Sequence, residues 1–460
     1  MQAPFDIAAD LDTPVSAYLK LNSLRPRFLL ESVEGGERLA RFSFLGFGDA
    51  VEVRMDGTSL WIDGKEEARP ESQQQYLDAM RRVLEIAPRP QPDDGLPFAG
   101  GLVGVSGYDV VRLFEKLPVD TQKQTNVPDA AFVAPASLLV FDHLTRRVAL
   151  LHDGPEEERQ RLRADVIRLL RGSVPPVPDK VSVSPAEASL TEEEFSERVN
   201  ACKEYIASGD IYQIVLSVLF RGKTNVSPFE VYRALRLLNP SPYMFFFDFD
   251  DLQVVGSSPE ALVKLNGVTA SLRPIAGTLP RGATSEEDDA NEAALLADPK
   301  EAAEHVMLVD LARNDLGRVA RAGSVCVDPY RAIERYSHVM HIVSGVQGEL
   351  AAEFDQFDLF AASFPAGTLV GAPKVRAMQI IEEMEQVGRG LYAGTAGYFG
   401  LSGDMDQAIT IRTLVFSGDE YSFQAGAGIV ADSVPAREYQ EVLAKSAILR
   451  RALEIAEGGL

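Results

Sequence analysis

Residues 243–272, YMFFFDFDDLQVVGSSPEALVKLNGVTASL, decide the fold class of this chain. The stretch contains three apolar runs, at 243–249, 252–258 and 261–272, which are separated only by short breaks. Within the third run, Asn266-Gly267 is a strong signal for a two-residue hairpin turn. Because strands joined by short turns pair antiparallel, the region predicts an antiparallel sheet.

The segments around this stretch come in blocks of helices and strands. In chain order they are a helix with a Thr191–Glu194 capping box that ends at Gly209, a strand at 211–220, a helix from Ser227-Pro228 to Asn239-Pro240, a helix near 300–320, a strand-like run at 341–350, a glycine-rich loop at 365–374 leading into a helix through about 386, strands near 391–399, 407–416 and 420–430, and a long helix from about Pro435. Such blocks differ from a regular βαβ rhythm, so they favour an α+β fold with antiparallel sheets.

Residues 1–171 predict a separate N-terminal region. Its strand-like runs lie at 28–32, 42–48, 50–55 and 59–64, followed by a hairpin and by a charged helix at about 155–171. Residues 172–189 concentrate Pro and Ser without apolar periodicity, which predicts a linker. Residues 190–460 are then expected to form the second domain.

The charge balance excludes several classes of function. The chain carries 68 Asp and Glu against 45 Lys and Arg, a formal net charge of -23. Nucleic-acid binding and attachment to anionic membranes both need clustered cations, so neither is expected. The N-terminus has acids where a signal peptide has Lys or Arg, and no apolar run approaches the ~18 residues of a membrane span. With only two cysteines, the chain is expected to be cytoplasmic.

Two predicted helices each present an E-x-x-E pair, Glu301 with Glu304 and Glu438 with Glu441. Spacing of three residues puts both carboxylates of a pair on one helix face. Two such faces opposite each other would form the oxygen-rich site that Mg²⁺ prefers, although a single pair is usually a solvated face.

Other residues suggest an anion as the ligand. The glycine-rich loops at 273–282, 364–374 and 425–430 allow backbone N–H groups to approach an anion, but tight turns explain such glycines equally well. Arg412 lies in an apolar strand-like run, where a guanidinium must meet an anion, so it is a candidate carboxylate clamp. His341, at the start of another such run, is either structural or catalytic.

Motifs along nearly the whole chain resemble the chorismate-utilising enzymes and, within them, the anthranilate synthase component I family. They are LLES, GDIYQIVLS, NPSPYMFFF, GSSPE, RPIAGTLPRG, EHVMLVDLARNDLGRV, HIVSGVQG, FPAGTLVGAPK, YAGTAGYFG, AITIRT and GAGIVADSVPAREYQEVLAKS. The resemblance implies large antiparallel sheets packed as a sandwich, with helices outside and two intertwined subdomains. It also implies the first step of tryptophan biosynthesis, in which chorismate is aminated at C2, loses its C4 hydroxyl and then loses pyruvate to give anthranilate.

The resemblance assigns roles to residues. Mg²⁺ would be held by Glu304 and Glu441, with Glu301 and Glu438 directly or through water. The implied substrate-binding positions are Gln213, Ala276, Gly277, Thr278, Tyr392, Arg412, Gly426, Ala427, Gly428 and Lys445. Glu260 of GSSPE corresponds to the general acid, which needs a raised pKa to be protonated at neutral pH. His341 is the candidate for proton transfer in pyruvate elimination, and Thr368 contacts the substrate.

Two positions separate the branches of the family. Relatives that add water carry Lys at the position of Gln213, and aminodeoxychorismate synthases carry Lys at that of Ala276. Because this chain has Lys at neither position, direct attack by ammonia is favoured, with anthranilate as the product. A synthase that stops at 2-amino-2-deoxyisochorismate, an aminodeoxychorismate synthase component I and a binding-only protein are the alternatives.

The resemblance also implies a partner and an effector. A glutaminase needs an exposed Cys on a strand-to-helix turn, and neither Cys202 nor Cys326 lies in such a context, so ammonia is expected from a separate glutamine amidotransferase subunit. Tryptophan is the expected feedback inhibitor. Its implied contacts are Leu30, Glu31, Ser32, Asn239, Pro242, Tyr243 and Met244.

Overall fold

The computed structural model describes residues 5–33, 41–92, 95–119, 121–123, 126–176, 181–335 and 339–460. Residues 177–180 of the expected linker lie outside this part. Within it, no helix is both long and apolar enough to cross a membrane. The helices are α1 (Pro14–Lys20), α2 (Gln73–Ile86), α3 (Glu156–Leu170), α4 (Glu192–Ser208), α5 (Pro228–Leu238), α6 (Ser285–Ala297), α7 (Pro299–Gly317), α8 (Gln356–Ser363), α9 (Lys374–Met384) and α10 (Pro435–Gly458), with short 3-10 turns η1 (Asn22–Leu24), η2 (Tyr108–Leu113) and η3 (Gly367–Leu369).

Most strands belong to one hydrogen-bonded network. They are β1 (Ile7–Ala8), β2 (Pro26–Glu31), β3 (Phe42–Met55), β4 (Ser59–Ile62), β5 (Lys65–Ala68), β6 (Gly101–Ser106), β7 (Ala130–Asp142), β8 (Arg147–His152), β9 (Glu187–Ala188), β10 (Gln213–Lys223), β11 (Tyr243–Asp248), β12 (Leu252–Ser258), β13 (Ala261–Asn266), β14 (Thr269–Leu272), β16 (Cys326–Val327), β19 (Val346–Glu349), β20 (Gly371–Ala372), β21 (Thr395–Gly400), β22 (Met405–Ile409), β23 (Thr413–Ser417) and β24 (Glu420–Ile429).

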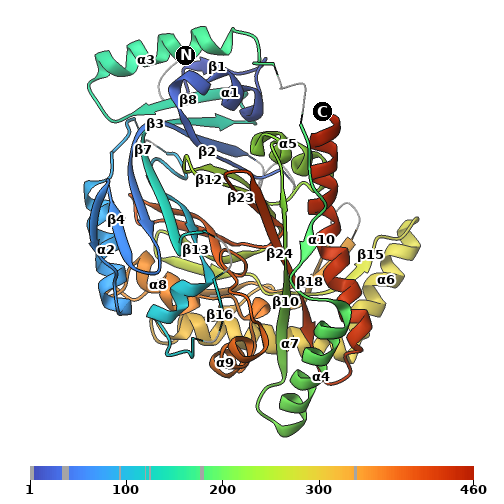
Figure 1. Cartoon of the computed structure of the whole chain (residues 1–460). Helices are drawn as coiled ribbons and strands as arrows, with labels where there is room; N and C mark the ends of the chain where they lie inside the picture. Colours follow the sequence, from blue (N-terminus) through green and yellow to red (C-terminus); the bar gives the residue numbers. More distant parts are fainter. Residues whose placement is uncertain are drawn as a thin grey trace.

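The network folds back on itself as two layers (Figure 1). One layer follows the antiparallel order β10-β24-β23-β12-β11-β2. The long strand β3 pairs with both β2 and β7, and the second layer continues through β6, β21, β22, β13, β14 and β19. A large hydrophobic core lies between the layers and under the helices. This confirms the predicted α+β class with large antiparallel sheets.

The chain changes layer at two neighbouring places. Between β12 and β13 it passes through Pro259 and Glu260, and between β22 and β23 it passes through residues 410–412. The two passages are hydrogen-bonded to each other, because Ile409 N donates to Glu260 O at 2.9 Å and Ser257 N donates to Arg412 O at 3.1 Å. Glu260 and Arg412 are therefore brought to one corner of the sandwich by strand pairing.

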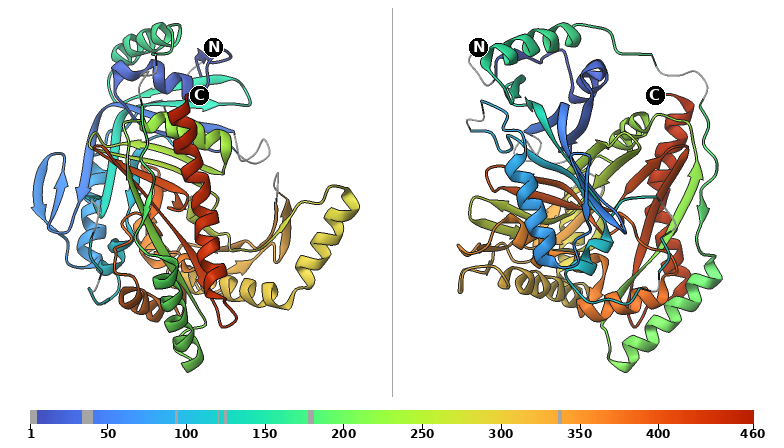
Figure 2. Two further views of the ribbon diagram at one scale, coloured as in Figure 1. Left: turned by 45° about the vertical axis from the view of Figure 1, so that its right-hand side comes forward. Right: turned by 60° about the vertical axis from the view of Figure 1, so that its left-hand side comes forward.

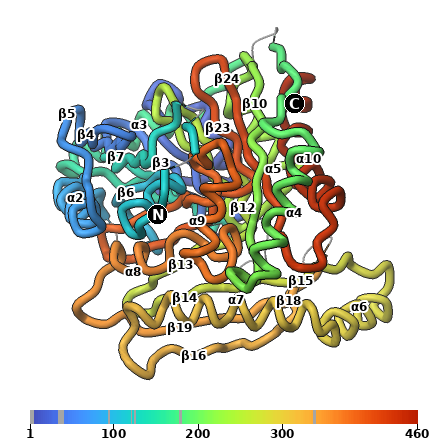
Figure 3. Tube along the Cα trace, turned by 60° about the horizontal axis from the view of Figure 1, so that its bottom comes forward, coloured from blue at the N-terminus to red at the C-terminus, as the bar shows by residue number. Residues whose placement is uncertain are grey.

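The helices around this corner follow local sequence signals. The α4 helix begins with the predicted capping box of Thr191 and Glu194 and ends at Gly209, whose φ of 84° is left-handed. The α10 helix packs against α4, α5 and β24. Figure 3 shows α7 running along one side of the body, next to β14, β19 and β16, toward α6.

A smaller unit, which we call the arm, consists of β15 (Ile275–Pro280), α6, β17 (Ala332–Arg335) and β18 (Val339–Val343). Its three strands form a separate antiparallel sheet in the order β15-β18-β17. The arm has a small core of its own around Leu295, Met340 and Ile342. It extends away from the rest of the molecule, as the left view of Figure 2 shows.

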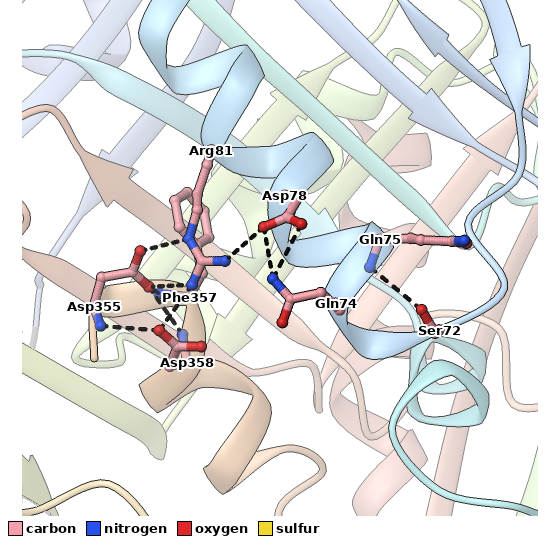
Figure 4. Close-up of polar contacts among 8 residues, drawn as sticks. All are labelled: Ser72, Gln74, Gln75, Asp78, Arg81, Asp355, Phe357 and Asp358. Carbon is pink, nitrogen blue, oxygen red and sulfur yellow. Dashed lines mark hydrogen bonds and ion pairs between the residues drawn. The ribbon is translucent and has the colours of Figure 1, made fainter. Parts of the chain in front are cut away.

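A polar cluster joins the N-terminal region to a later segment (Figure 4). Arg81 on α2 donates to Asp355 at 2.7 and 3.1 Å and to Asp358 on α8 at 2.8 Å. Asp355 is also the N-cap of α8 and accepts from the backbone N–H groups of Phe357 and Asp358. One carboxylate therefore both caps a helix and pairs with a cation across the two regions.

Some local predictions differ from the structure. The runs at 42–48 and 50–55 form a single strand, β3, with an irregularity in its pairing between Phe47 and Ala50. In the predicted hairpin, Asn266 still pairs with Thr269, so the turn consists of Gly267 and Val268. Gly267 takes the left-handed φ of 58°, which moves the turn by one residue.

Candidate active site

A cavity of about 500 Å³ opens at the corner formed by the two passages between layers. Its walls come from β10, β24, η3, α7, α10 and the first residue of β15, Ile275. The predicted site residues that line it are Gln213, Glu260, Glu304, Thr368, Tyr392, Arg412, Gly426, Gly428, Glu438, Glu441 and Lys445. These residues come from eight separate segments of sequence, so pairing and packing of distant strands and helices create the cavity.

Glu260 is a carboxyl group whose pKa changes on burial at the cavity. Burial raises its pKa from 4.5 to about 7, against the opposing effects of Thr368 and of the positive charge of Arg412. Thr368, in η3, donates its hydroxyl to Glu260 Oε1 at 3.1 Å. Near neutral pH the carboxyl group is therefore partly protonated and can donate a proton.

Arg412 lies at the cavity, but its backbone differs from the prediction. The apolar run around it is broken between β22 and β23, and Arg412 occupies this break with a left-handed φ of 50°. The break is the passage between layers, which is a tertiary feature. The guanidinium of Arg412 remains placed to meet an anion beside Glu260.

The glycines of β24 keep one wall of the cavity open. A Cβ at Gly426 would lie 2.6 Å from Tyr392 Oη and 2.7 Å from Leu216 O. A Cβ at Gly428 would lie 2.9 Å from Gln213 Nε2. The strand therefore needs glycine at position 426, where a backbone oxygen is close, whereas at position 428 the end of the Gln213 side chain could move aside. Ala427 between them is fully buried and is not among the lining residues.

Acidic side chains reach the cavity from two helices, Glu304 from α7 and Glu438 and Glu441 from α10. Glu441 pairs with Lys445 at 2.7 Å, and Lys445 also donates to Gly426 O at 3.1 Å. Glu301 is not one of the described lining residues; burial first and then the charge of Glu304 raise its pKa. Among the described residues, no three His, Cys, Asp or Glu side chains are grouped closely enough to hold a metal ion.

The remaining predicted catalytic positions lie on the arm. His341 Nδ1 is 2.9 Å from Gly277 O and 3.1 Å from Thr278 Oγ1, and Ala276 precedes them on β15. None of these four residues is among the described residues that line the cavity. The structure thus brings together the site residues of the body but does not bring those of the arm into the same cavity.

Several residues that line this cavity were not predicted from the sequence, among them Gln424, Arg437, Lys300 and Asp432. Two of them had a detectable signal. Gln424 precedes Gly426 and Gly428 at the two-residue period of one strand face. Arg437 is four residues before Glu441 and therefore on the same helix face.

A second cavity of about 440 Å³ contains most of the predicted effector residues. Those that line it are Leu30, Glu31, Ser32, Pro242, Tyr243 and Met244. Asn239 is not among its described lining residues; its side-chain amide donates to Ser257 Oγ at 2.8 Å. The carboxylate of Glu31 already accepts from Arg236 at 2.9 and 3.1 Å and from the hydroxyl of Tyr232.

Comparison with known proteins agrees with this geometry. The model of the chorismate binding enzyme family matches residues 25–451. The chain belongs to the chorismate-binding enzymes. Within this family it is 45% identical to "Anthranilate synthase component 1" of Aquifex aeolicus, over 98% of this chain and 94% of the relative. The protein of the same name from Thermus thermophilus is 46% identical, over 98% and 97%.

A solved structure supports the same branch of the family. Anthranilate synthase component I from Streptococcus pneumoniae TIGR4 superposes with a TM-score of 0.80 and 35% sequence identity. The match covers 98% of this chain and all of that one. The resemblance to the anthranilate synthase component I family is thereby confirmed over nearly the full length.

Proposed function

We propose that this chain converts chorismate and ammonia into anthranilate, pyruvate and water. The observation that carries the proposal is Glu260, a buried carboxyl group with a pKa of about 7 beside Arg412 in a cavity of about 500 Å³. The cavity is large enough for a small dicarboxylate, and the relatives named above are anthranilate synthases.

Arg412, Tyr392 and the open β24 wall would hold the enolpyruvyl carboxylate of chorismate. Ammonia forms the bond to C2 while the ring double bonds shift and the C4–O bond breaks. Glu260 donates its proton to the departing hydroxyl, which leaves as water. In the second step, loss of the C2 proton and cleavage of the bond to the enolpyruvyl oxygen aromatise the ring and release pyruvate. His341 is the proposed group for this proton transfer.

Mg²⁺ is the proposed cofactor. Three carboxylates from two helices line one cavity, and burial first and then the charge of Glu304 raise the pKa of Glu301. Such an all-oxygen set fits Mg²⁺. Glu304 and Glu441 would hold it, with Glu301 and Glu438 directly or through water. When bound, the ion supplies positive charge to the ring carboxylate of the substrate.

A glutamine amidotransferase subunit is the proposed source of ammonia, in a cytoplasmic hetero-oligomer. The relatives are named as a first component. Cys202 is buried inside α4 and Cys326 lies in the two-residue strand β16, so neither is on a strand-to-helix turn. This arrangement is consistent with ammonia made by another chain.

Tryptophan is the proposed inhibitor, bound in the second cavity. Besides the predicted residues, the aromatic side chains of Phe44 and Tyr398 line it, which suits an indole ring. Ser32→Leu should fill part of this cavity and abolish inhibition while leaving uninhibited turnover close to wild type. Activity assays with increasing tryptophan would measure this, and unchanged inhibition would refute the assignment.

The activity itself can be tested with the purified chain, chorismate, Mg²⁺ and an ammonium salt at alkaline pH. Anthranilate fluorescence should rise in the wild-type chain and in Glu204→Gln, a control on the exposed face of α4. Consumption of chorismate without fluorescence would indicate a product arrested before pyruvate loss. No consumption by the wild-type chain would contradict the proposed function.

A further inference from the structure

A buried ion pair lies directly beneath the cavity and has no part in the chemistry described so far. The side chains of Arg389 and Glu385 are only 1% and 4% exposed. Arg389 Nε and one terminal nitrogen donate to the two oxygens of Glu385 at 2.8 and 2.7 Å. This two-point pairing holds the guanidinium plane in one orientation.

The same guanidinium contacts two other segments of the chain. It donates to Leu369 O of η3 at 2.8 Å and to Val215 O of β10 at 2.8 Å. Leu369 and Val215 both line the cavity. One side chain therefore links η3 to β10, in addition to the backbone hydrogen bond from Val215 N to Val370 O at 2.9 Å.

Two further lining residues depend on the pair. Arg389 stacks over the ring of Tyr392, with 5.6 Å from its guanidinium carbon to the ring centre. Glu385 accepts from the backbone and the hydroxyl of Ser217 at 2.9 and 2.8 Å, and Gln424 donates to that hydroxyl at 2.8 Å. Both Tyr392 and Gln424 line the cavity.

A buried ion pair is a weak means of increasing stability, because desolvation of the two charges offsets their attraction. The planar guanidinium of Arg389 does, however, bind the Glu385 carboxylate, Leu369 O and Val215 O in fixed directions. Neither an apolar pair nor Lys can reproduce this arrangement. Arg389 contacts the backbone of Leu369 and Val215 and the ring of Tyr392, which line the cavity, so its geometry can reach the substrate through these residues.

We propose that Arg389, oriented by Glu385, is a positioning residue for the reaction, which sets the η3 turn against Glu260 and the Tyr392 ring against the substrate. The inference rests on the proposed function. Arg389 acts on Glu260 through the residue next to Leu369, namely Thr368, which donates to the Glu260 carboxylate.

Loss of the Arg389 contacts should raise the pKa of Glu260. The hydrogen bond from Thr368 lowers the pKa of Glu260, so a displaced η3 turn lets that pKa rise further. The charged groups that share its two cavities remain in place. They are Arg412, Lys300, Glu304, Asp432, Arg437, Glu438, Glu441 and Lys445 in the larger cavity, and Arg273 and Asp315 in the smaller one. A general acid works in its protonated form, so kcat falls at high pH, where Glu260 is ionised. This descending limb of the plot of kcat against pH should therefore move to higher pH.

Arg389→Lys keeps the charge and removes the fork. We expect kcat to fall about 10²-fold, as for a misplacement of about 1 Å, KM for chorismate to rise, and the descending limb to move to higher pH. Arg389→Met combined with Glu385→Gln removes both charges, keeps an acceptor for Ser217 and should still fold. It should show the same kinetic changes.

Arg112→Lys is the matched control. Arg112 pairs with the buried Glu382 on α9 and with Asp109, yet none of its recorded contacts is with a residue that lines the cavity. It should lower the thermal midpoint while leaving KM and the pH limb unchanged. In addition, Thr368→Val should move the limb to higher pH, and adding Arg389→Lys to it should move the limb no further.

The proposal is overturned if Arg389→Lys and the double variant behave as Arg112→Lys does, with changes in the thermal midpoint alone. Additive shifts of the limb in the Thr368→Val background would also overturn it. A wild-type chain that makes no anthranilate would instead contradict the proposed function. Calorimetric titration with chorismate then decides the positioning role, because Arg389→Lys must weaken binding and Arg112→Lys must not.

Discussion

The body and the arm carry the two halves of the predicted catalytic centre, and only the body half lines the cavity. The glycines of β24 belong to the large network of paired strands in the body, and Glu260 and Arg412 lie at the two breaks between its strands. His341 and Gly277 belong to a three-stranded sheet with a separate small core. Residues that share one sheet are placed by its register, whereas residues on the arm depend on how the arm is oriented.

This difference implies a division of labour between the two steps. The body holds the groups proposed for substrate binding and for loss of the C4 hydroxyl. The arm holds the histidine proposed for pyruvate elimination, at Nδ1 distances of 2.9 and 3.1 Å from neighbours on β15. Variants in the body should therefore affect the first step, and variants in the arm the second.

The largest effect is expected for Glu260→Gln. The amide cannot donate a carboxylic proton to the leaving hydroxyl, so kcat for chorismate consumption should fall about 10³-fold. KM should change little, because Gln retains the size of Glu. Stopped-time assays of chorismate and anthranilate measure both quantities. Retention of more than a tenth of wild-type kcat would remove Glu260 from the role of general acid.

His341→Ala tests the arm half. Aromatisation should slow by about 10²-fold, while amination keeps most of its rate, because only the second step uses the imidazole. The aminated intermediate should then accumulate and be visible by chromatography. Equal loss of both steps would show that His341 has a structural role or acts before amination.

The next effect concerns the dependence of stability on the ionisation of Glu260. Its folded pKa of about 7 lies above the value of 4.5 for an exposed carboxyl group. Its favourable contribution is complete below pH 4.5 and is lost as pH rises through about 7, because the ionised form must then be buried. Glu260→Gln should thus be more stable than wild type at pH 8, on the order of 3 kcal/mol, and equal at pH 4.

Urea unfolding at the two pH values measures this difference. Glu204→Gln, on the exposed side of α4, should show no such dependence on pH. An equal gain at pH 4 and pH 8 would mean that the gain comes from packing and that the carboxyl group titrates normally.

Helices with local sequence signals were predictable from the sequence, whereas features set by the pairing of distant strands were not. Local patterns located α4, α5 and α10 well, and Gly426 and Gly428 of β24 line the cavity. The break at Arg412 and the separation of His341 from the cavity could not be predicted, because both arise from the way distant strands pair. The raised pKa of Glu260 was expected only from its role, and its physical cause, burial, needs the folded structure.

The smallest effect is expected for a matched pair of glycines, one in each half. Gly277 has a left-handed φ of 63°, and a Cβ there would lie 2.9 Å from Leu295 Cδ1 and 3.0 Å from Glu301 Oε2. Gly277→Ala should destabilise the arm by about 1 kcal/mol. Gly426→Ala, crowded against the Tyr392 hydroxyl, should instead raise KM. Hydrogen exchange of Gly277→Ala tests whether the arm unfolds by itself. Faster exchange confined to β15 and β18 would establish the arm as a separate unit. Faster exchange throughout β10 and β24 in the same variant would show that arm and body unfold together.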